Sequence, residues 1–189
     1  MITINNDTIL KDDNPIIRTK SEPVALPLSS ENEEILRTMF QYVKDSTDEE
    51  KAKELNLRPA VGISAIQIGI PRQLTAVIVN EYDKNDELVT WQYMLANPRI
   101  ISRSEQCAYL ENGEGCLSVV KEHPGHVVRS ARIKVKAFDL LAGKEVTIRA
   151  RGYLAIVLQH EIDHFSGVLF YDHIDTKDPE KEIPGAMVI

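Results

Sequence analysis

The run His160-Glu161-Ile162-Asp163-His164 constrains this 189-residue chain more than any other feature. Residues four apart on an α-helix project from nearly the same face, so His160 and His164 can bind one ion. Glu161 lies one step round the helix, where its carboxylate can take a proton from an attacking water without binding the metal. The run therefore predicts a helix that carries a hydrolytic metal site. The alternative is a buried amphipathic helix with two hydrogen-bonded histidines, since HExxH fixes only three residues.

The composition is ordinary for a soluble globular protein, with 43% hydrophobic and 27% charged residues. A chain of this length predicts one domain over 1–189. The formal net charge of -7 argues against strong nucleic-acid binding, because phosphate recognition favours a basic surface. No signal peptide pattern opens the sequence, and no run approaches about 18 apolar residues. We therefore expect a cytoplasmic protein with no membrane contact.

The N-terminal third predicts an arm followed by two helices. Three prolines between 1 and 28 favour an extended arm. A capping box at Ser30-x-x-Glu33, followed by apolar residues at helical spacing, predicts a helix over 31–46. A second box, Thr47-x-x-Glu50, opens a shorter, highly charged helix that ends near Leu57. We interpret this second helix as a solvated insertion.

The remaining pattern predicts strands and then one helix. Apolar runs indicate strands over 74–79, over 93–96 and 100–101 around a turn at Asn97-Pro98, and over 108–110. Apolar and polar residues alternate strictly over 132–137 and 146–150, with Gly143 between the two runs. This pattern predicts an antiparallel hairpin with one solvent-exposed face. The helix with the two histidines should run over 152–166 and end at Gly167. This order predicts an α+β fold with antiparallel or mixed sheets packed around a central metal-binding helix.

A catalytic metal site needs a third protein ligand from outside the helix. The longer motif HExxHxxGxxH is followed only as far as Gly167, because Phe170 occupies the place of the third histidine. Cys116 stands out, since glycines at 113 and 115 allow a tight backbone that can approach a metal. The other candidates are Cys107, for which we expect a core position, His123, His126 and His173, for which we expect surface loops, and the downstream carboxylates. Two cysteines are too few for a disulfide framework, so at least one should act as a thiol or thiolate.

Three segments resemble the ordered motifs of the peptide deformylases, and the resemblance covers essentially the whole chain. They are Gly62-Ile63-Ser64-Ala65-Ile66-Gln67, Glu114-Gly115-Cys116-Leu117-Ser118 and Gln159-His160-Glu161-Ile162-Asp163-His164. The charged insertion near 47–58 and the lack of a long helical C-terminal tail are similar to the longer bacterial class of Gram-positive lineages. The chain is therefore expected to share the fold and chemistry of that family.

The first motif departs from the family pattern at three positions. Ala60 stands where glycine is usual, Ser64 where alanine is usual, and Ile66 where proline is common, whereas Gln67 is retained. An alanine with a left-handed backbone costs on the order of 1 kcal/mol or more in conformational free energy. Either Ala60 does not adopt that conformation, or its loop is shifted relative to the loop of the family. The departures concern the shape of the substrate groove rather than the chemistry.

The resemblance implies removal of the formyl group from the N-terminal formyl-methionine of new polypeptides, with release of formate. It implies that Cys116, His160 and His164 bind Fe²⁺, for which Zn²⁺, Ni²⁺ or Co²⁺ can substitute. Glu161 would be the general base. The Gln67 amide and the Leu117 backbone N–H would stabilise the oxyanion.

The resemblance also implies how the substrate binds. The formyl-methionyl peptide would lie beside the backbone of Val61, Gly62 and Ile63 as an added strand. Glu114 and Gly115 of the second motif are also expected at the substrate. Ile156 and Val157, one turn before the ligands, would form part of an apolar slot for methionine, although each could equally be plain core. We expect a monomer that acts on nascent chains at the ribosome.

Two other functions compete with this one. A HExxH peptidase that cleaves internal bonds would need a different third ligand, and Phe170 argues against its commonest form. A noncatalytic metal-binding or ribosome-associated module would need neither Glu161 nor Gln67, because neither is required merely to hold a metal. Formate release from a formyl-Met peptide would separate the three.

Overall fold

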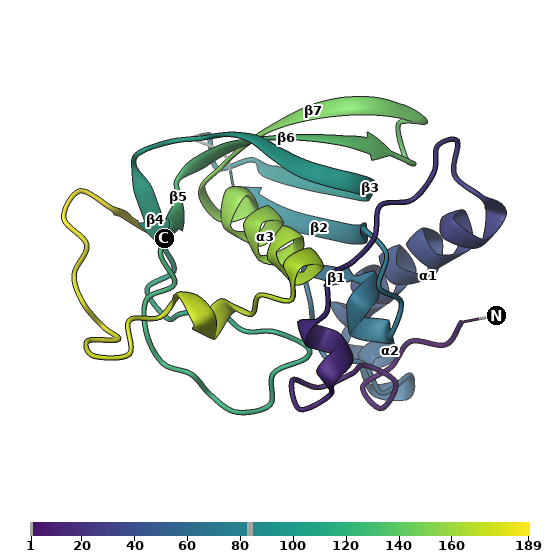
Figure 1. The fold of residues 1–189 in the computed structure, drawn as a ribbon, viewed down its shortest axis with the longest axis horizontal. Coiled ribbons are helices and arrows are strands. Elements are labelled where there is room, and N and C mark those ends of the chain that lie inside the picture. The colour runs from purple at the N-terminus through teal and green to yellow at the C-terminus, as the bar shows by residue number, and fades with distance from the viewer. Residues whose placement is uncertain (1, 83–84) are drawn as a thin grey trace.

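The computed structural model describes residues 2–82 and 85–189, which form two sheets with helices between and beside them (Figure 1). The larger sheet has the strand order β1-β2-β3-β6-β7 and the smaller one the order β5-β4-β8. The strands are β1 (Gly62–Ser64), β2 (Leu74–Tyr82), β3 (Leu88–Arg103), β4 (Cys107–Tyr109), β5 (Arg129–Ser130), β6 (Arg132–Asp139), β7 (Lys144–Arg151) and β8 (Met187–Val188). The helices are α1 (Ser30–Ser46), α2 (Glu49–Glu54) and α3 (Gly152–Asp163), with 3₁₀ turns at Pro15–Arg18, Ala65–Ile68, His164–Ser166 and Phe170–His173.

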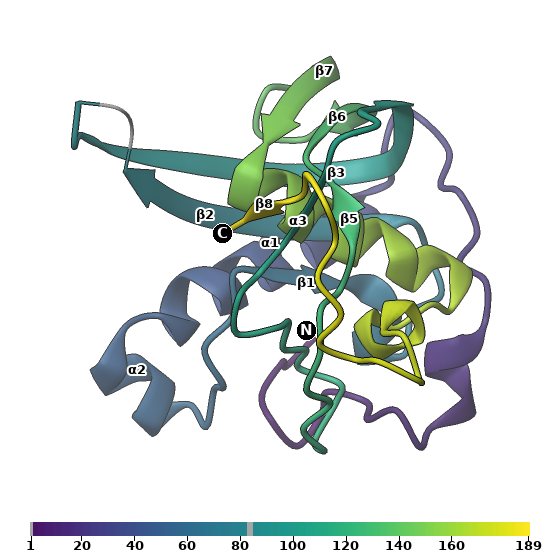
Figure 2. The ribbon, with the colours of Figure 1, turned by 90° about the vertical axis from the view of Figure 1, so that its left-hand side faces the viewer.

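Strand β2 is buried on both faces over its first six residues, 74–79, with one of them half-buried, because a helix covers each side of the larger sheet there. Leu74 and Ala76 face the core beneath α1, whereas Val77 and Val79 face the core beneath α3. This explains why β2 reads as a continuous apolar run rather than an alternating one. Figures 1 and 2 show α1 and α3 beside the same strands.

Helix α3 lies between the two sheets, as the predicted α+β fold requires. Val157 and Leu158 pack against the larger sheet, and Ile156 packs with Ala108 and Ala131 of the smaller-sheet region. The predicted extent of 152–166 is correct, but the last turn, His164–Ser166, is 3₁₀. Gly167 ends it at a φ of 68°, where a Cβ atom would lie 2.3 Å from the Arg18 carbonyl oxygen.

The two predicted helix caps were each wrong by one residue. Helix α1 is capped by Ser29 rather than Ser30, and α2 by Asp48 rather than Thr47. A cap residue must have an extended backbone while its side chain accepts an N–H of the first turn. Ser29 and Asp48 meet that condition, with ψ angles of 156° and 115°. Helix α2 is exposed or half-buried along its length, in agreement with a solvated insertion.

The predicted turn at Asn97-Pro98 is instead an irregularity inside one long strand, β3. Asn97 has a φ of 52°, and its side chain pairs with Val24 of the arm: Oδ1 accepts from the Val24 N–H and Nδ2 donates to its carbonyl, both at 2.8 Å. The local sequence suggested a break because asparagine and proline favour turns. The contact with a distant arm, invisible in that pattern, keeps the strand continuous.

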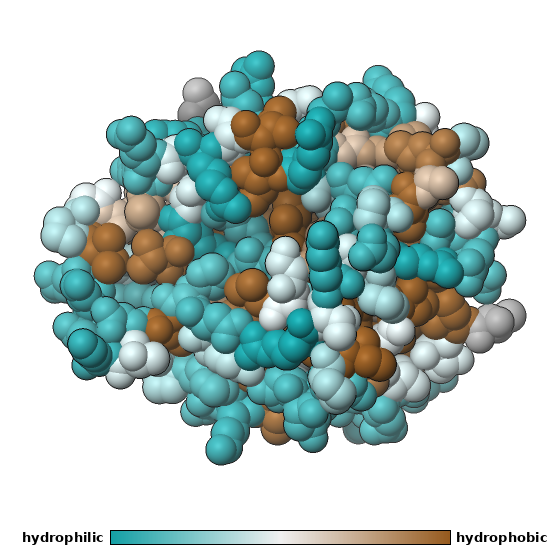
Figure 3. Space-filling model, viewed as in Figure 1, coloured by the Kyte–Doolittle hydropathy of each residue, from teal (hydrophilic) through white to brown (hydrophobic). Residues whose placement is uncertain are grey.

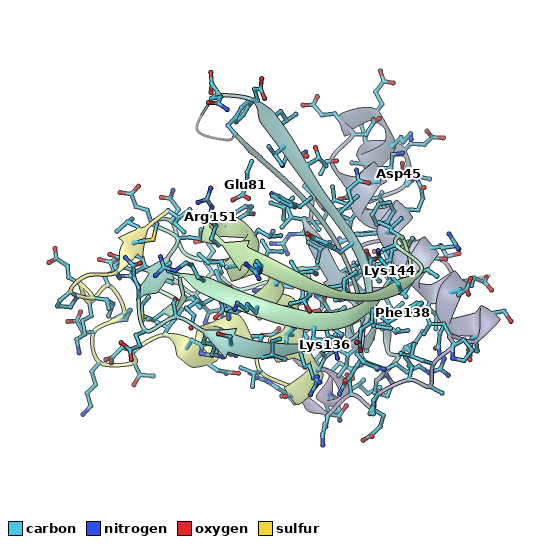
Figure 4. The ribbon with its side chains drawn as sticks, turned by 90° about the horizontal axis from the view of Figure 1, so that it is seen from above. Asp45, Glu81, Lys136, Phe138, Lys144 and Arg151 are labelled. Atoms are coloured by element: carbon cyan, nitrogen blue, oxygen red, sulfur yellow. The ribbon has the colours of Figure 1, made fainter. Side chains whose placement is uncertain are left out.

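The hairpin of β6 and β7 has the predicted solvent-exposed face, and that face is strongly basic (Figure 4). Lys134 lies opposite Arg149, and Arg132 lies opposite Arg151. With Arg103 of β3 they line a groove of about 350 Å³ whose charged lining residues are all basic. Like charges directly opposite each other on a sheet are unfavourable. Although the chain as a whole carries a net negative charge, this face is a concentrated positive surface.

The face seen in Figure 3 is mostly hydrophilic, and its hydrophobic residues gather in separate patches. In the described part of the chain, every helix is too short or too polar to cross a membrane.

Candidate metal centre

A cleft of about 330 Å³ opens between the β1 region, helix α3 and the segment 114–117. Its lining includes these residues predicted from the sequence: Val61, Gly62, Gln67, Glu114, Gly115, Cys116, Leu117, Ile156, Val157, His160 and Glu161. Two predicted residues lie outside that lining. His164 is 1% exposed at the back of the site, and the Ile63 side chain packs into the core beneath α1. Ile63 can therefore offer a substrate only its backbone.

The three predicted ligands lie together. One donor atom from each of Cys116, His160 and His164 lies within 4.8 Å of the others, and Cys116 Sγ is 3.5 Å from His164 Nε2. The two imidazole rings are 5.1 Å apart and nearly perpendicular. One thiolate and two imidazoles form a donor set suited to a divalent transition metal with an open coordination position.

A buried ionic network behind the ligands holds His160. Glu114 Oε2 lies 2.8 Å from His160 Nδ1, which leaves Nε2 for a metal. Arg129 donates two bonds to Glu114 and one, at 2.8 Å, to Asp163. Arg129 and Glu114 side chains are each 3% exposed. His173 extends the network, since its Nε2 lies 2.8 Å from Asp163.

Sequence reasoning missed Arg129, Asp163 and His173 as parts of the site. Arg129 belongs to a two-residue strand with no motif around it, so nothing local indicates its burial. Asp163 lies inside HEIDH, and its spacing of three residues from His160 could have indicated a second acidic group near the ligands. His173 was expected on the surface, and it is exposed there while bonded to Asp163.

The network changes the protonation of its members. Burial opposes ionisation of Cys116, but the nearby His164 and His160 outweigh it and lower the pKa of the thiol to about 6. Burial also opposes the charge on Glu114, yet hydrogen bonds from His160 and Arg129 keep the pKa of Glu114 below its usual value. The pKa of His160 lies well above its usual value, because bonds to Cys116 and Glu114 outweigh burial. A thiolate is thus available near neutral pH.

Glu161 lies at the cleft with its two oxygens in different surroundings. Oε2 accepts a hydrogen bond from Ser64 at 2.7 Å, and Thr75 Oγ1 is 3.4 Å away. Oε1 faces Gly62, where an added Cβ atom would be only 2.5 Å away. A side chain at position 62 would therefore displace the Glu161 carboxylate from this place.

Gln67 is held so that its amide nitrogen points toward the candidate metal ligand. Its Oε1 accepts the Ser64 backbone N–H at 2.9 Å, which fixes the orientation of the amide. Its Nε2 then lies 3.1 Å from Ser118 Oγ and 3.5 Å from Cys116 Sγ. Leu117 borders the same cleft, and its N–H has no acceptor among the described residues.

The other candidate ligands lie apart from the cluster. Cys107 is half-buried on β4, so the expected core position was wrong. His126 stacks on Tyr109, and His123 stacks on Tyr171. Phe170, in place of a third histidine, is buried with its ring 6.2 Å from that of His160.

The departures in the first motif leave the backbone unstrained. The left-handed non-glycine residues of the described chain are Asn56, Asp86 and Asn97, so Ala60 has an ordinary φ. In the second motif, Gly113 has a φ of 73°, whereas a Cβ atom on Gly115 would meet open space. Gly115 thus borders room in the cleft rather than a tight backbone contact.

The chain is similar throughout to proteins of one family. Residues 6–180 match the family model described as polypeptide deformylase. The chain is 46% identical to peptide deformylase 2 of Geobacillus stearothermophilus and 45% identical to that of Bacillus subtilis strain 168, covering 100% of this chain and 99% of each relative. Among solved structures, the peptide deformylase of Ehrlichia chaffeensis is 28% identical with a TM-score of 0.70, over 91% of this chain and 89% of that one. A Met-Ala-Ser-bound peptide deformylase of Acinetobacter baumannii is 26% identical with a TM-score of 0.69, over 92% and 100%.

The lowered pKa of Cys116 predicts a pH-dependent reaction of the metal-free protein. A thiolate is the reactive form, so alkylation of Cys116 by iodoacetamide should rise between pH 5 and 7, with a midpoint near the pKa of about 6. Adding Zn²⁺ should protect Cys116 but not Cys107. Peptide mass spectrometry distinguishes the two sites, and equal protection of both thiols would contradict the assignment of Cys116 as the ligand.

The buried network predicts a large effect of Arg129→Met. Removing Arg129 leaves two buried or half-buried carboxylates, Glu114 and Asp163, without their shared cation, and only His160 still bonds Glu114, so the free energy of unfolding should fall by about 3–5 kcal/mol. Metal affinity should fall about 10- to 100-fold, because Glu114, the partner of His160, loses the two hydrogen bonds that fix its position. Urea unfolding and metal titration measure the two effects.

Arg132→Met, on the exposed face of β6, is the matched control and should change neither quantity. If Arg129→Met does not fold, Arg129→Lys serves instead, because it keeps the positive charge but cannot form the bidentate hydrogen bond to Glu114. We expect Arg129→Lys to lower the free energy of unfolding and the metal affinity by less than Arg129→Met. If Arg129→Met lowers the free energy of unfolding by less than about 1 kcal/mol, the Arg129–Glu114 pair does not support the structure.

Proposed function

The chain belongs to the peptide deformylase family, and we propose that Cys116, His160 and His164 hold the divalent metal of its reaction. The enzyme is a hydrolase that removes the formyl group from the N-terminal formyl-methionine of newly made polypeptides and releases formate. The convergence of the three donor atoms within 4.8 Å is the observation that carries the metal assignment. We further propose that residues 1–189 act as one catalytic domain.

The ligand set fits a divalent transition metal. His164 is buried and Cys116 is poised as a thiolate near neutral pH, while Glu114 directs the free nitrogen of His160 toward the same point. A divalent ion held there supplies Lewis acidity, which makes water a nucleophile at neutral pH. We propose Fe²⁺ as the ion, because a thiolate is a soft ligand that suits ferrous iron, with Zn²⁺, Ni²⁺ or Co²⁺ able to substitute.

Three groups of the chain would act on the substrate during hydrolysis. Glu161 takes the proton of the attacking water and passes it to the leaving amine, a role favoured by its place at the cleft beside the ligands. The Gln67 amide and the Leu117 N–H donate hydrogen bonds to the formyl oxygen as negative charge builds on it. The fixed orientation of Gln67 supports this role, because its donor is aimed before the reaction begins.

The peptide would bind along the free edge of β1. This strand is the outer strand of the larger sheet, so one side of its backbone pairs with β2 and the other is available to an added strand. Val61, Gly62 and Ile63 would supply those backbone groups. Gly115 would leave room beside them, and Glu114 would act mainly through His160. The methionine side chain would enter the slot lined by Ile156 and Val157.

Nascent chains in the cytoplasm, presented by the ribosome, are the proposed natural substrates of this monomeric enzyme. The basic groove on β6 and β7 supports weak, salt-sensitive contact with ribosomal RNA, because arginine and lysine pair with phosphates. Arg151 of the groove is two residues from Tyr153, which lines the active cleft. A ribosome bound there would lie beside the entrance for the nascent chain.

Glu161→Gln should lower kcat at least about 100-fold while metal content and melting temperature stay unchanged, since only the proton carrier is lost. Formate release from formyl-Met-Ala-Ser is the assay, and an internally quenched peptide without a formyl group serves as the control for peptidase activity. Cleavage of the control peptide, or substantial formate release by the metal-loaded variant, would contradict the proposed mechanism.

The groove predicts that Lys134→Ala/Arg149→Ala weakens cosedimentation with ribosomes at low salt without changing kcat on a free formyl-Met peptide. Both side chains are exposed and lie outside the cleft lining. Lys20→Ala/Lys53→Ala removes the same number of exposed charges away from the groove and the cleft lining and is the matched control. Equal cosedimentation of both double variants would exclude the groove as the ribosome contact.

A further inference from the structure

Ser64 is the departure from the family pattern that brings a new polar group to the reacting residues. Its side chain is completely buried, at 0% exposure. Its hydroxyl oxygen lies 2.7 Å from Glu161 Oε2 and 3.0 Å from the Glu161 backbone carbonyl oxygen. An alanine, the usual residue at this position, would make neither contact.

We propose that Ser64 is a positioning residue, whose hydroxyl holds the Glu161 carboxylate in its catalytic orientation. The inference rests on the proposed function, because it takes Glu161 as the general base. The residue acts through Glu161 and does not touch the substrate itself.

The geometry identifies Ser64 as the main donor to Glu161. An ionised carboxylate only accepts hydrogen bonds, and 2.7 Å lies in the short range of a charge-assisted O–H···O bond. Thr75 is a weaker candidate, since its hydroxyl is 3.4 Å from the same oxygen and 3.0 Å from the Ile63 carbonyl. No lysine or arginine of the described chain forms an ion pair with Glu161.

Holding Oε2 also places Oε1. The terminal torsion of a glutamate has a broad distribution, so one fixed oxygen is needed to set the other. Oε1 faces the open side of Gly62 at the cleft, where the substrate would lie. The Ser64 hydroxyl has one proton, and the Glu161 carbonyl, 3.0 Å away, competes with the carboxylate for it; the shorter contact of 2.7 Å makes the carboxylate the main acceptor. Through that bond, strand β1 fixes the carboxylate relative to the substrate edge.

Ser64→Ala, measured in the wild-type and Glu161→Gln backgrounds, tests the proposal. With Glu161 present, kcat and kcat/KM for formyl-Met-Ala-Ser should fall together by about 10-fold at unchanged KM, because a misplaced catalytic group slows the chemical step. In the Glu161→Gln background the same substitution should change kcat by less than about twofold, because no base remains to be positioned. In crystals of Ser64→Ala, the Glu161 carboxylate should occupy more than one orientation.

Ser21→Ala is the matched control, since Ser21 is also completely buried and its hydroxyl has no partner among the described residues. Its kcat should equal that of the wild type. An equal fall of kcat for Ser64→Ala in both backgrounds, or a loss of metal, would assign Ser64 a merely structural role. Wild-type kcat in Ser64→Ala, with Glu161→Gln inactive, would overturn the Ser64 assignment alone. Full activity of Glu161→Gln would instead refute the general base and this proposal with it.

Discussion

The buried pair between Arg129 and Glu114 is the interaction on which the site depends. It joins the loop that carries Cys116 to β5 and, through Asp163 and His160, to α3. Removing two charges from water is unfavourable, and the attraction offsets that cost only where geometry and additional hydrogen bonds are good. Here the guanidinium binds Glu114 through two nitrogens and Asp163 through a third. A loop and a helix distant in sequence are thereby fixed to each other, which a three-ligand site requires.

The larger sheet supplies the rest of the geometry. Burial of both faces of β2 fixes α1 and α3 on opposite sides, so that α3 runs past the edge strand β1. Three of the proposed site residues come from rigid elements: His160 and Glu161 from the helix and Gly62 from the strand. Rigid elements position catalytic groups more precisely than loops do. Cys116 and Leu117 belong to a loop, and the bonds of Glu114 in the ionic network anchor that loop.

Sequence predicted the periodic parts of this fold and the cluster formed by Cys116, His160 and His164. The α3 helix, the hairpin and the α+β class followed from spacing, and the comparisons agree with the family resemblance. Where a distant contact decides the outcome, local pattern failed. Asn97 depends on Val24, and the buried Arg129 depends on Glu114. The predicted helix caps lay one residue after Ser29 and one residue before Asp48, because several neighbouring side chains can accept a hydrogen bond from a first-turn N–H.

Gly62 and Ser64 illustrate why one position of the first motif is constrained and another is free to vary. A side chain at 62 would collide with Glu161 Oε1, at 2.5 Å, so glycine there is a requirement of the carboxylate's location. At 64 the constraint is only volume, since the site is fully buried and small. Alanine and serine both fit, and they differ by one hydroxyl. That hydroxyl meets an acceptor-only carboxylate in a site of low dielectric, where a hydrogen bond is stronger than in water. A substitution that leaves the backbone unchanged therefore still alters how firmly Glu161, the proposed base, is held.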